Sequence, residues 1–191
     1  MEVSFVASAY LPDQYPPPDR PEVAFAGKSN VGKSSLLNRL VNRRHLAVTS
    51  SKPGRTRSIN FFAVGRDLYF VDLPGYGYAK VPVSVKRSWK KMVETYLEGR
   101  PTLKGVVLIV DIRRDPDSND LDLLHWLNHH GIAAVAVVTK ADKLSRQKAL
   151  IRASEITKRL EPLIEHKPII FSARTGIGRE ELWEMIKCLI R

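Results

Sequence analysis

Residues 27–34 read Gly-Lys-Ser-Asn-Val-Gly-Lys-Ser and match the phosphate-binding pattern G-x-x-x-x-G-K-[ST]. The glycines of such a loop let the backbone wrap closely around a triphosphate, so that consecutive N–H groups and a helix N-terminus point at negative charge. Lys33 would reach the β and γ phosphates, and the Ser34 hydroxyl would bind Mg²⁺. An apolar, strand-like run precedes the loop at 23–26 and a helix-like run follows it at 35–40, which argues against a simple glycine turn.

A second segment suited to the same chemistry is Asp72-Leu73-Pro74-Gly75, which follows the strand-like run 67–71. An aspartate at the end of a strand beside a phosphate loop can hold Mg²⁺, usually through water. Gly75 can donate its N–H to a γ-phosphate. The D-x-x-G pattern is weak alone, but here it lies at a strand end, 39 residues after Lys33. It therefore predicts the metal side of the site.

The segment Thr139-Lys140-Ala141-Asp142 follows the apolar run 132–138 and suits recognition of a base. The Asp142 carboxylate can accept both the N1–H and the 2-amino hydrogens of guanine, a pattern that adenine does not offer. The stem of Lys140 can lie over the base plane, and a backbone N–H within 172–174 can meet the guanine O6. Together these segments predict a guanine nucleotide. A P-loop kinase or ATPase would instead need a lid of arginines over the phosphates.

The elements that position these segments alternate between two periods. Strand-like runs lie at 22–26, 59–65, 67–71, 105–111, 132–138 and 168–171, and helical patterns lie at about 33–43, 84–98, 118–130, 145–162 and 178–190. The later strands are continuously apolar, as parallel strands covered on both faces are. This alternation predicts an α/β fold, a three-layer doubly wound sheet that is mostly parallel, with the ligand at the C-terminal ends of the strands.

The domain organisation is predicted to be simple. Residues 1–22 contain five prolines and should form an extended segment packed on the domain, with alternating Val3, Phe5 and Ala7 as a short edge strand. Residues 23–191 should form a single nucleotide-binding domain of ordinary size. In the helix predicted at 84–98, Trp89 is expected in the core rather than as a stacking platform for nucleic acid.

Composition indicates a cytoplasmic protein without a membrane span or signal peptide. The single cysteine, Cys188, lies among apolar residues and is expected to be buried. His125 and His129 share a helical face, but no third ligand lies nearby in the sequence, so an exposed pair is favoured over a metal site.

The net charge of +11 is unevenly distributed along the chain. Residues 23–93 hold fourteen Lys and Arg against two acidic residues, whereas the rest of the chain holds seventeen against eighteen. A nucleotide needs only a few of these charges, so the excess predicts an anionic partner, most plausibly RNA. A solvated basic face remains the alternative. The expected surface comprises Arg43, Arg44, Lys52, Lys86, Arg87, Lys90 and Lys91.

Taken together, these motifs resemble the GTPases of the Era/EngA/septin group, and most closely the EngB family of ribosome-biogenesis GTPases. The resemblance covers essentially 5–190. It rests on the blocks Gly-Lys-Ser-Asn-Val-Gly-Lys-Ser-Ser, Lys-Pro-Gly-Arg-Thr-Arg-Ser-Ile-Asn-Phe-Phe (52–62), Asp-Leu-Pro-Gly-Tyr-Gly-Tyr-Ala (72–79), Thr-Lys-Ala-Asp and Ser-Ala-Arg. It implies a P-loop GTPase with a Ras-like G domain, and a monomer that acts on a large ribosomal subunit precursor through ribosomal RNA, with a downstream link to division and septation.

The resemblance also implies roles for individual residues. Mobile switches would lie at 44–58 and 72–83. Catalytic roles fall to Lys33, Thr56, Gly75 and Asn30, and Mg²⁺ is bound at Ser34, Thr56 and Asp72. GTP or GDP would be bound by Gly27, Lys28, Ser29, Asn30, Val31, Gly32, Lys33, Ser34, Ser35, Gly54, Arg55, Thr56, Arg57, Ser58, Asp72, Leu73, Pro74, Gly75, Thr139, Lys140, Ala141, Asp142, Phe171, Ser172, Ala173 and Arg174.

Three positions depart from the common GTPase pattern. Thr139 replaces an asparagine that mainly supports the phosphate loop, so guanine selection should persist. Arg174 replaces a frequent lysine, but the important contact there comes from the backbone. Tyr76 replaces the glutamine that orients the attacking water in Ras-type enzymes, which predicts slow unaided hydrolysis.

Charge stabilisation would then have to come from elsewhere. Asn30 matches the asparagine that helps hold K⁺ in potassium-activated members of the group, or it bonds only to switch backbone. Arg55 and Arg57 are either charge stabilisers or contacts to ribosomal RNA. A constitutive RNA-binding module with structural nucleotide is the second alternative function.

Overall fold

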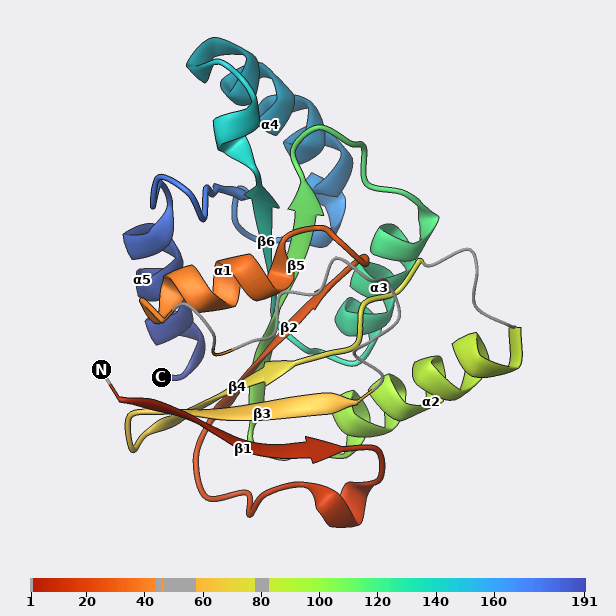
Figure 1. Cartoon of the computed structure of the whole chain (residues 1–191). Helices are drawn as coiled ribbons and strands as arrows, with labels where there is room; N and C mark the ends of the chain where they lie inside the picture. Colours follow the sequence, from red (N-terminus) through yellow and green to blue (C-terminus); the bar gives the residue numbers. More distant parts are fainter. Residues whose placement is uncertain (1, 44–45, 47–57, 78–82) are drawn as a thin grey trace.

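The computed structural model describes residues 2–43, 46, 58–77 and 83–191 (Figure 1). The predicted roles of Gly54, Arg55, Thr56 and Arg57 therefore lie outside the described residues, as do Arg44 and Lys52. The strands are β1 (Val3–Ala9), β2 (Glu22–Gly27), β3 (Ile59–Val64), β4 (Leu68–Asp72), β5 (Leu103–Asp111), β6 (Ala134–Thr139) and β7 (Ile169–Ile170). The helices are α1 (Lys33–Leu40), α2 (Val83–Gly99), α3 (Ser118–His129), α4 (Arg146–Leu160) and α5 (Arg179–Leu189).

The strands form one sheet in the order β1-β3-β4-β2-β5-β6-β7. Strands β4, β2, β5, β6 and β7 pair in parallel, whereas β3 is antiparallel to both β4 and β1. β3 and β4 form a hairpin because only three residues, 65–67, separate them, and so short a connection allows only an antiparallel return. This is the predicted mostly parallel α/β architecture.

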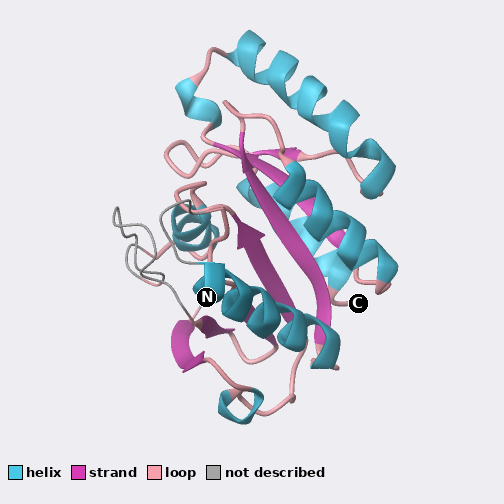
Figure 2. Cartoon of the chain, turned by 90° about the vertical axis from the view of Figure 1, so that its right-hand side faces the viewer, coloured by secondary structure: helices cyan, strands magenta, loops and turns pink. Residues whose placement is uncertain are grey.

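Helices cover both faces of the sheet (Figures 1 and 2). On one face, Leu36, Leu37 and Leu40 of α1 pack with Leu182 and Ile186 of α5 against side chains of the sheet. On the other face, α2 and α3 contribute Tyr96, Leu97 and Leu127 to a second cluster, and α3 and α4 share a third cluster. Strands buried on both faces account for the continuously apolar sequence of β5 and β6.

The N-terminal segment adds β1 as an edge strand paired with β3, as the alternation of Val3, Phe5 and Ala7 predicted. The segment is not extended throughout, because Pro12–Gln14 form a short 3₁₀ turn. Proline, which lacks a backbone N–H, is acceptable there because the N–H groups of a first helical turn have no acceptor within the helix. The Gln14 side chain accepts from the backbone N–H of Tyr10 at 2.7 Å and so secures the turn.

Two side chains differ from expectation. Cys188 is exposed, because the inward face of α5 is occupied by Leu182 and Ile186 instead. Trp89 is only half-buried; among the side chains of α2 that the structure describes, those fully buried are Tyr96 and Leu97 in its C-terminal part.

Candidate nucleotide-binding site

The phosphate loop connects β2 to α1 and is shaped by two glycines. Gly32 has φ +106°, a left-handed conformation, and forms the N-cap of α1, so the free N–H groups of the first turn point into the loop. Gly27 passes so close to β5 that an added Cβ would lie 2.8 Å from the carbonyl oxygen of Ile109. Asn30, also left-handed at φ +64°, completes the turn.

Lys33 and Asp72 meet at this loop. The Lys33 ammonium forms an ion pair with the carboxylate of Asp72, and both residues are buried, at 8% and 4% exposure. Lys33 begins α1 and Asp72 ends β4, which pairs in parallel with β2. The two predicted motifs therefore converge, and Ser34 lies half-buried beside Lys33.

The segment expected to bind the base is held by hydrogen bonds that connect it to the phosphate loop. The Thr139 hydroxyl donates to the carbonyl oxygen of Val31 at 2.7 Å, as expected for a residue supporting that loop. Lys140 donates from Nζ to the carbonyl oxygen of Asn30 at 2.6 Å. Asp142 accepts from the hydroxyl of the fully buried Ser172 at 2.7 Å, which fixes its carboxylate at the pocket.

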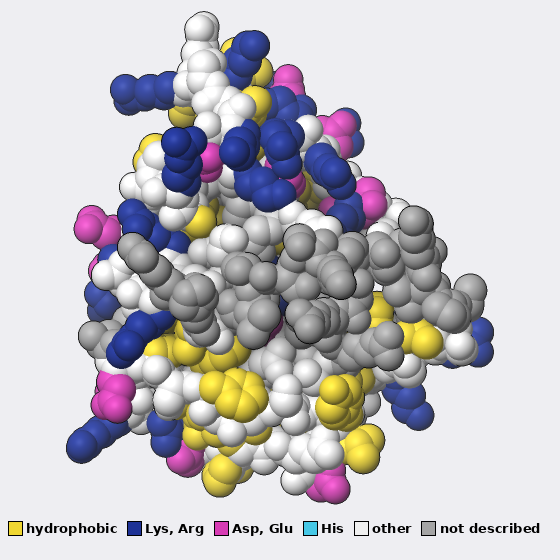
Figure 3. Space-filling view, in the orientation of Figure 1, with side chains coloured by type: hydrophobic (Ala, Val, Ile, Leu, Met, Phe, Trp, Pro, Cys, Tyr) yellow, Lys and Arg dark blue, Asp and Glu magenta, His cyan; other side chains and the backbone are white. Residues whose placement is uncertain are grey.

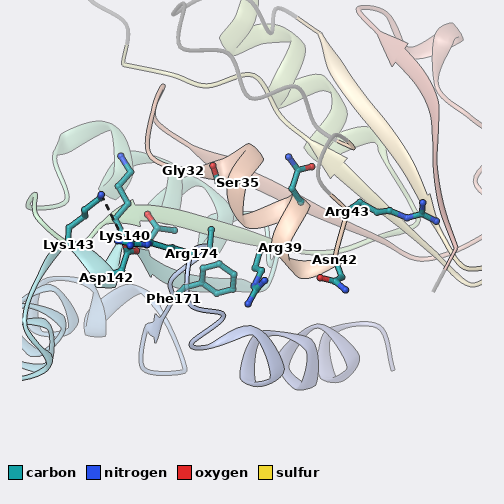
Figure 4. A pocket seen from close by; sticks show the side chains of 13 residues that line it. Gly32, Ser35, Arg39, Asn42, Arg43, Lys140, Asp142, Lys143, Phe171 and Arg174 are labelled. Carbon is teal, nitrogen blue, oxygen red and sulfur yellow. Dashed lines mark ion pairs between the residues drawn. The ribbon is translucent and has the colours of Figure 1, made fainter.

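A cavity of about 810 Å³ joins these segments (Figure 4). Its lining comprises Gly32, Ser35, Asn38, Arg39, Asn42, Arg43, Thr139, Lys140, Asp142, Lys143, Phe171, Ala173 and Arg174. It extends along α1, from Gly32 to Arg43 just beyond the end of the helix, and across to the ends of β6 and β7. Its volume is within the usual range for ligand sites. In Figure 4, Lys140, Asp142 and Lys143 gather at one end, and Arg43, just beyond the end of α1, lies at the other.

Asp111 is a site residue that the motif analysis missed. It ends β5, is 5% exposed, and accepts from Arg113 Nε at 2.9 Å and pairs with Lys140 Nζ at 2.9 Å. Burial alone would raise the pKa of Asp111, but the hydrogen bonds from Arg113 and Lys140 outweigh it and hold that pKa well below its usual range. Asp111 stays ionised and orients the lysine of the base motif. An acid closing the apolar run 105–111 was its only sequence signal.

Lys28 and Tyr76 do not direct their side chains to the cavity. Lys28 pairs with Asp117 and Asp120, and the Tyr76 hydroxyl donates to Asp120, so both side chains end on α3. Lys28 can therefore serve a nucleotide only through its backbone.

The residues expected at a magnesium ion fit that chemistry as far as they are described. Ser34 offers a hydroxyl and Asp72 a carboxylate, both oxygen ligands of the kind Mg²⁺ prefers. Ser34 follows Lys33 in the sequence, and Asp72 forms the ion pair with Lys33. Within the described part of the chain, no group of three or more His, Cys, Asp or Glu residues is placed to hold a metal, and His125 and His129 are exposed.

The described basic side chains are not confined to the region of highest sequence charge. Arg43, Arg87, Lys90 and Lys91 are exposed, as expected, although Lys90 lies 3.6 Å from Glu94. Further exposed cations are Arg113, Arg114, Lys143, Arg146 and Arg174, and of these Lys143 and Arg174 line the cavity. Figure 3 shows Lys and Arg side chains gathered over the upper part of the molecule in that view. In the residues that the structure describes, no helix is long and apolar enough to cross a membrane.

The arrangement of a phosphate loop at the C-terminal edge of a mostly parallel, helix-flanked sheet is that of a P-loop GTPase. A family model described as "50S ribosome-binding GTPase" matches residues 22–140. The chain is 54% identical over 185 residues to the "Probable GTP-binding protein EngB" of Syntrophus aciditrophicus, covering 97% of this chain and 93% of the relative. It is also 54% identical over 186 residues to the protein of the same description from Geobacter metallireducens, covering 97% and 91%.

Solved structures agree. A crystal structure of a probable GTP-binding protein EngB has a TM-score of 0.68 and 26% identity, covering 89% of this chain and 98% of that one. The chain belongs to the EngB family of GTP-binding proteins, and it is a GTPase.

Proposed function

We propose that this GTPase is a switch in assembly of the large ribosomal subunit, hydrolysing GTP slowly and linked downstream to cell division and septation. The observation that supports the site most directly is a cavity that Gly32 of the phosphate loop lines together with Thr139, Lys140 and Asp142 of the base segment. The loop expected to bind phosphate and the segment expected to bind guanine therefore border one space, as a nucleotide requires.

At the phosphate end, Lys33 would bind the β and γ phosphates, and Gly75 would donate its N–H to the γ-phosphate. Mg²⁺ would be held by Ser34, by Thr56 and, through water, by Asp72. Bound there, the ion would supply positive charge that neutralises the phosphates during hydrolysis. The ion pair of Lys33 with Asp72 supports this assignment because it puts a phosphate-binding cation and a metal-binding carboxylate at the same loop.

At the base end, Asp142 would accept the two guanine donors, with Lys140 over the base plane and a backbone N–H near Ala173 at O6. The hydrogen bond from Ser172 supports this role, because it restricts the orientation of the Asp142 carboxylate before the base arrives. A preorganised acceptor loses less entropy on binding.

We also propose that a K⁺ ion binds beside the phosphates in addition to Mg²⁺, with Asn30 as one of its ligands. Tyr76 is committed to α3, so it does not orient the attacking water, and charge stabilisation between the β and γ phosphates is the remaining means of acceleration.

The proposed partner is ribosomal RNA or a large-subunit precursor. The description of the matching family as ribosome-binding and the excess of fourteen Lys and Arg over two acids in 23–93 support it. A monomer acting in the cytoplasm fits this role. The alternative is a constitutive RNA-binding module in which nucleotide is only structural.

Parallel measurements test this proposal. Affinities for GTP, GDP and ATP are determined by titration, and co-sedimentation with ribosomal subunits is compared with GTP, with GDP and without nucleotide. A switch binds large-subunit particles differently in the three states. Equal particle binding in all three would favour the constitutive module, and equal affinity for ATP and GTP would contradict the guanine site.

A further inference from the structure

Tyr76 is the first residue after Gly75, and its side chain is held by α3. Its hydroxyl donates to Oδ1 of Asp120 at 2.7 Å. Its ring packs where the two apolar clusters on the α2, α3 and α4 face of the sheet meet. Burial raises the pKa of Tyr76 well above its usual value and the charge of Asp120 raises it further, so the phenol remains a donor at neutral pH.

Lys28, the second residue of the phosphate loop, reaches the same carboxylate. Its Nζ lies 3.0 Å from Oδ2 of Asp120 and 2.6 Å from Oδ2 of Asp117. The Asp117 N–H donates to Asp120 Oδ2 at 3.0 Å, which completes a capping box at the start of α3. The Asp120 carboxylate, which is 2% exposed, thus accepts from three donors. They are Lys28 Nζ of the phosphate loop, the hydroxyl of Tyr76 and the backbone N–H of Asp117 at the start of α3.

The backbones of the two segments lie side by side. Ser29 donates its N–H to the carbonyl oxygen of Tyr76 at 3.1 Å, and Tyr76 donates to the carbonyl oxygen of Gly27 at 3.4 Å. A Cβ at Gly75 would lie 3.1 Å from both N and Oγ of Ser29, so any side chain there would push the two segments apart by a few tenths of an ångström. Because Gly75 has no side chain of its own, the contacts of its neighbour Tyr76 determine where its N–H lies relative to the loop.

We propose that Asp120 anchors a tether, formed with Tyr76 and Lys28, that sets the position of the Gly75 N–H. Tyr76 and Asp120 are then positioning residues for recognition of the γ-phosphate. The inference rests on the proposed function, in which Gly75 contacts that group. GDP has no γ-phosphate, so loosening the tether weakens GTP binding and leaves GDP binding unchanged.

The test is Tyr76→Phe, which removes one hydroxyl and keeps the ring. Affinities for a non-hydrolysable GTP analogue and for GDP are measured by titration, and hydrolysis by single turnover. The ratio of GTP-analogue to GDP affinity should fall about tenfold, the loss of one hydrogen bond to a charged acceptor. GDP affinity should stay within about twofold, and hydrolysis should slow.

Tyr96→Phe is the matched control. Its hydroxyl also donates to a buried carboxylate at 2.7 Å, that of Glu22, at the opposite end of β2. It should lower stability comparably while leaving the affinity ratio unchanged. Asp120→Asn is the second variant. It keeps an acceptor for Tyr76 but loses the ion pair with Lys28, so the ratio should again fall.

The results of these measurements distinguish failure of the tether from failure of the proposed function. An unchanged ratio in both Tyr76→Phe and Asp120→Asn, or an equal fall in Tyr96→Phe, overturns the tether. A wild-type protein that binds GTP and GDP equally poorly overturns the proposed function instead.

Discussion

At the scale of single residues, the geometry around Asp142 leads to a specificity prediction. Asp142→Asn should shift preference from guanine to xanthine nucleotides, because an amide can donate to the xanthine 2-oxo group where the carboxylate accepted from the 2-amino group. Affinity for GDP should fall about 10- to 100-fold, the usual effect of losing hydrogen bonds to a charged group. Titration with GDP and XDP checks this.

The control for Asp142→Asn is Ser172→Ala, which removes the hydroxyl that orients the carboxylate at 2.7 Å but leaves the acceptor itself. It should weaken GDP binding without any gain for XDP. A gain for XDP in Ser172→Ala, or none in Asp142→Asn, would show that base selection lies elsewhere.

Asn30 supports a prediction about hydrolysis. It is exposed in a left-handed turn of the phosphate loop, and Lys140 occupies only its backbone oxygen. If Asn30 holds K⁺, GTP hydrolysis should be about tenfold faster in KCl than in NaCl at equal ionic strength, as expected for one well-placed charge. Asn30→Ala should abolish the difference. Equal rates in both salts, with and without ribosomal particles, would remove the hypothesis.

At the scale of elements, the start of β2 and the end of α2 are joined by a buried ion pair. Arg100 donates from Nε to Glu22 at 2.7 Å and from Nη2 to the carbonyl oxygen of Pro16 at 2.8 Å. Glu22 also accepts from Tyr96 and from Thr102. The network connects the N-terminal segment, β2, α2 and the start of β5 at the end of the sheet opposite the nucleotide site.

Arg100→Met should therefore lower the free energy of unfolding by about 3–5 kcal/mol, because it leaves the Glu22 carboxylate buried without its cation. Urea unfolding measures this. The double variant Arg100→Met with Glu22→Leu should recover part of the loss, since it leaves no buried charge unpaired. A double variant less stable than Arg100→Met would contradict that explanation.

The elements also show what could be predicted from the sequence. Apolar runs and glycines located the strands and the phosphate loop, because burial on both faces leaves a direct mark on the sequence. Helix ends were harder. The pattern of α1 continued to Arg43, but the helix ends at Leu40, since Asn42 adopts φ +54°. The Asn42 and Arg43 N–H groups bond back to Arg39 and Asn38 in a Schellman arrangement.

The site was predictable where its residues are neighbours in the sequence and not where they are distant. Gly32, Lys33 and Asp142 carry their chemistry in short motifs. Asp111 and Asp120 do not, because their partners lie 29 and 44 residues away and meet them only through strand order and helix packing. The local sequence around Asp120 fits a capping box with Asp117 at the start of α3, but it does not show that Lys28 and Tyr76 also reach this carboxylate.

At the scale of the whole molecule, acids and bases of the described residues are distributed differently in space than along the chain. The exposed cations Lys143 and Arg174 come from the part of the sequence with no net excess of positive charge, yet they line the base end of the cavity. In all, the lining holds five Lys and Arg against one acid, Asp142; the five are Arg39, Arg43, Lys140, Lys143 and Arg174. The field at the mouth of the site is therefore more positive than the sequence count implies.

Two surfaces are candidates for the RNA contact: the basic side chains of α2 and the cations around the cavity. Charge reversal on α2 shows which of the two RNA binding depends on. Lys86, Arg87, Lys90 and Lys91 changed together to glutamate should weaken binding to large-subunit particles by at least about tenfold, through lost counterion release, and reduce its salt dependence. GTP affinity should be unaffected, because the described side chains among them, those of Arg87, Lys90 and Lys91, do not line the cavity. Co-sedimentation across a salt series measures both quantities.

A control variant with the same change in charge replaces four other lysines by glutamate. They are exposed, lie outside 23–93, and are Lys104, Lys158, Lys167 and Lys187. If particle binding depends on a surface at α2, this control keeps most of its affinity. If both variants lose affinity equally, only net charge matters. If neither loses affinity, α2 is a solvated face, and the cations around the cavity mouth become the RNA contact to be reversed next.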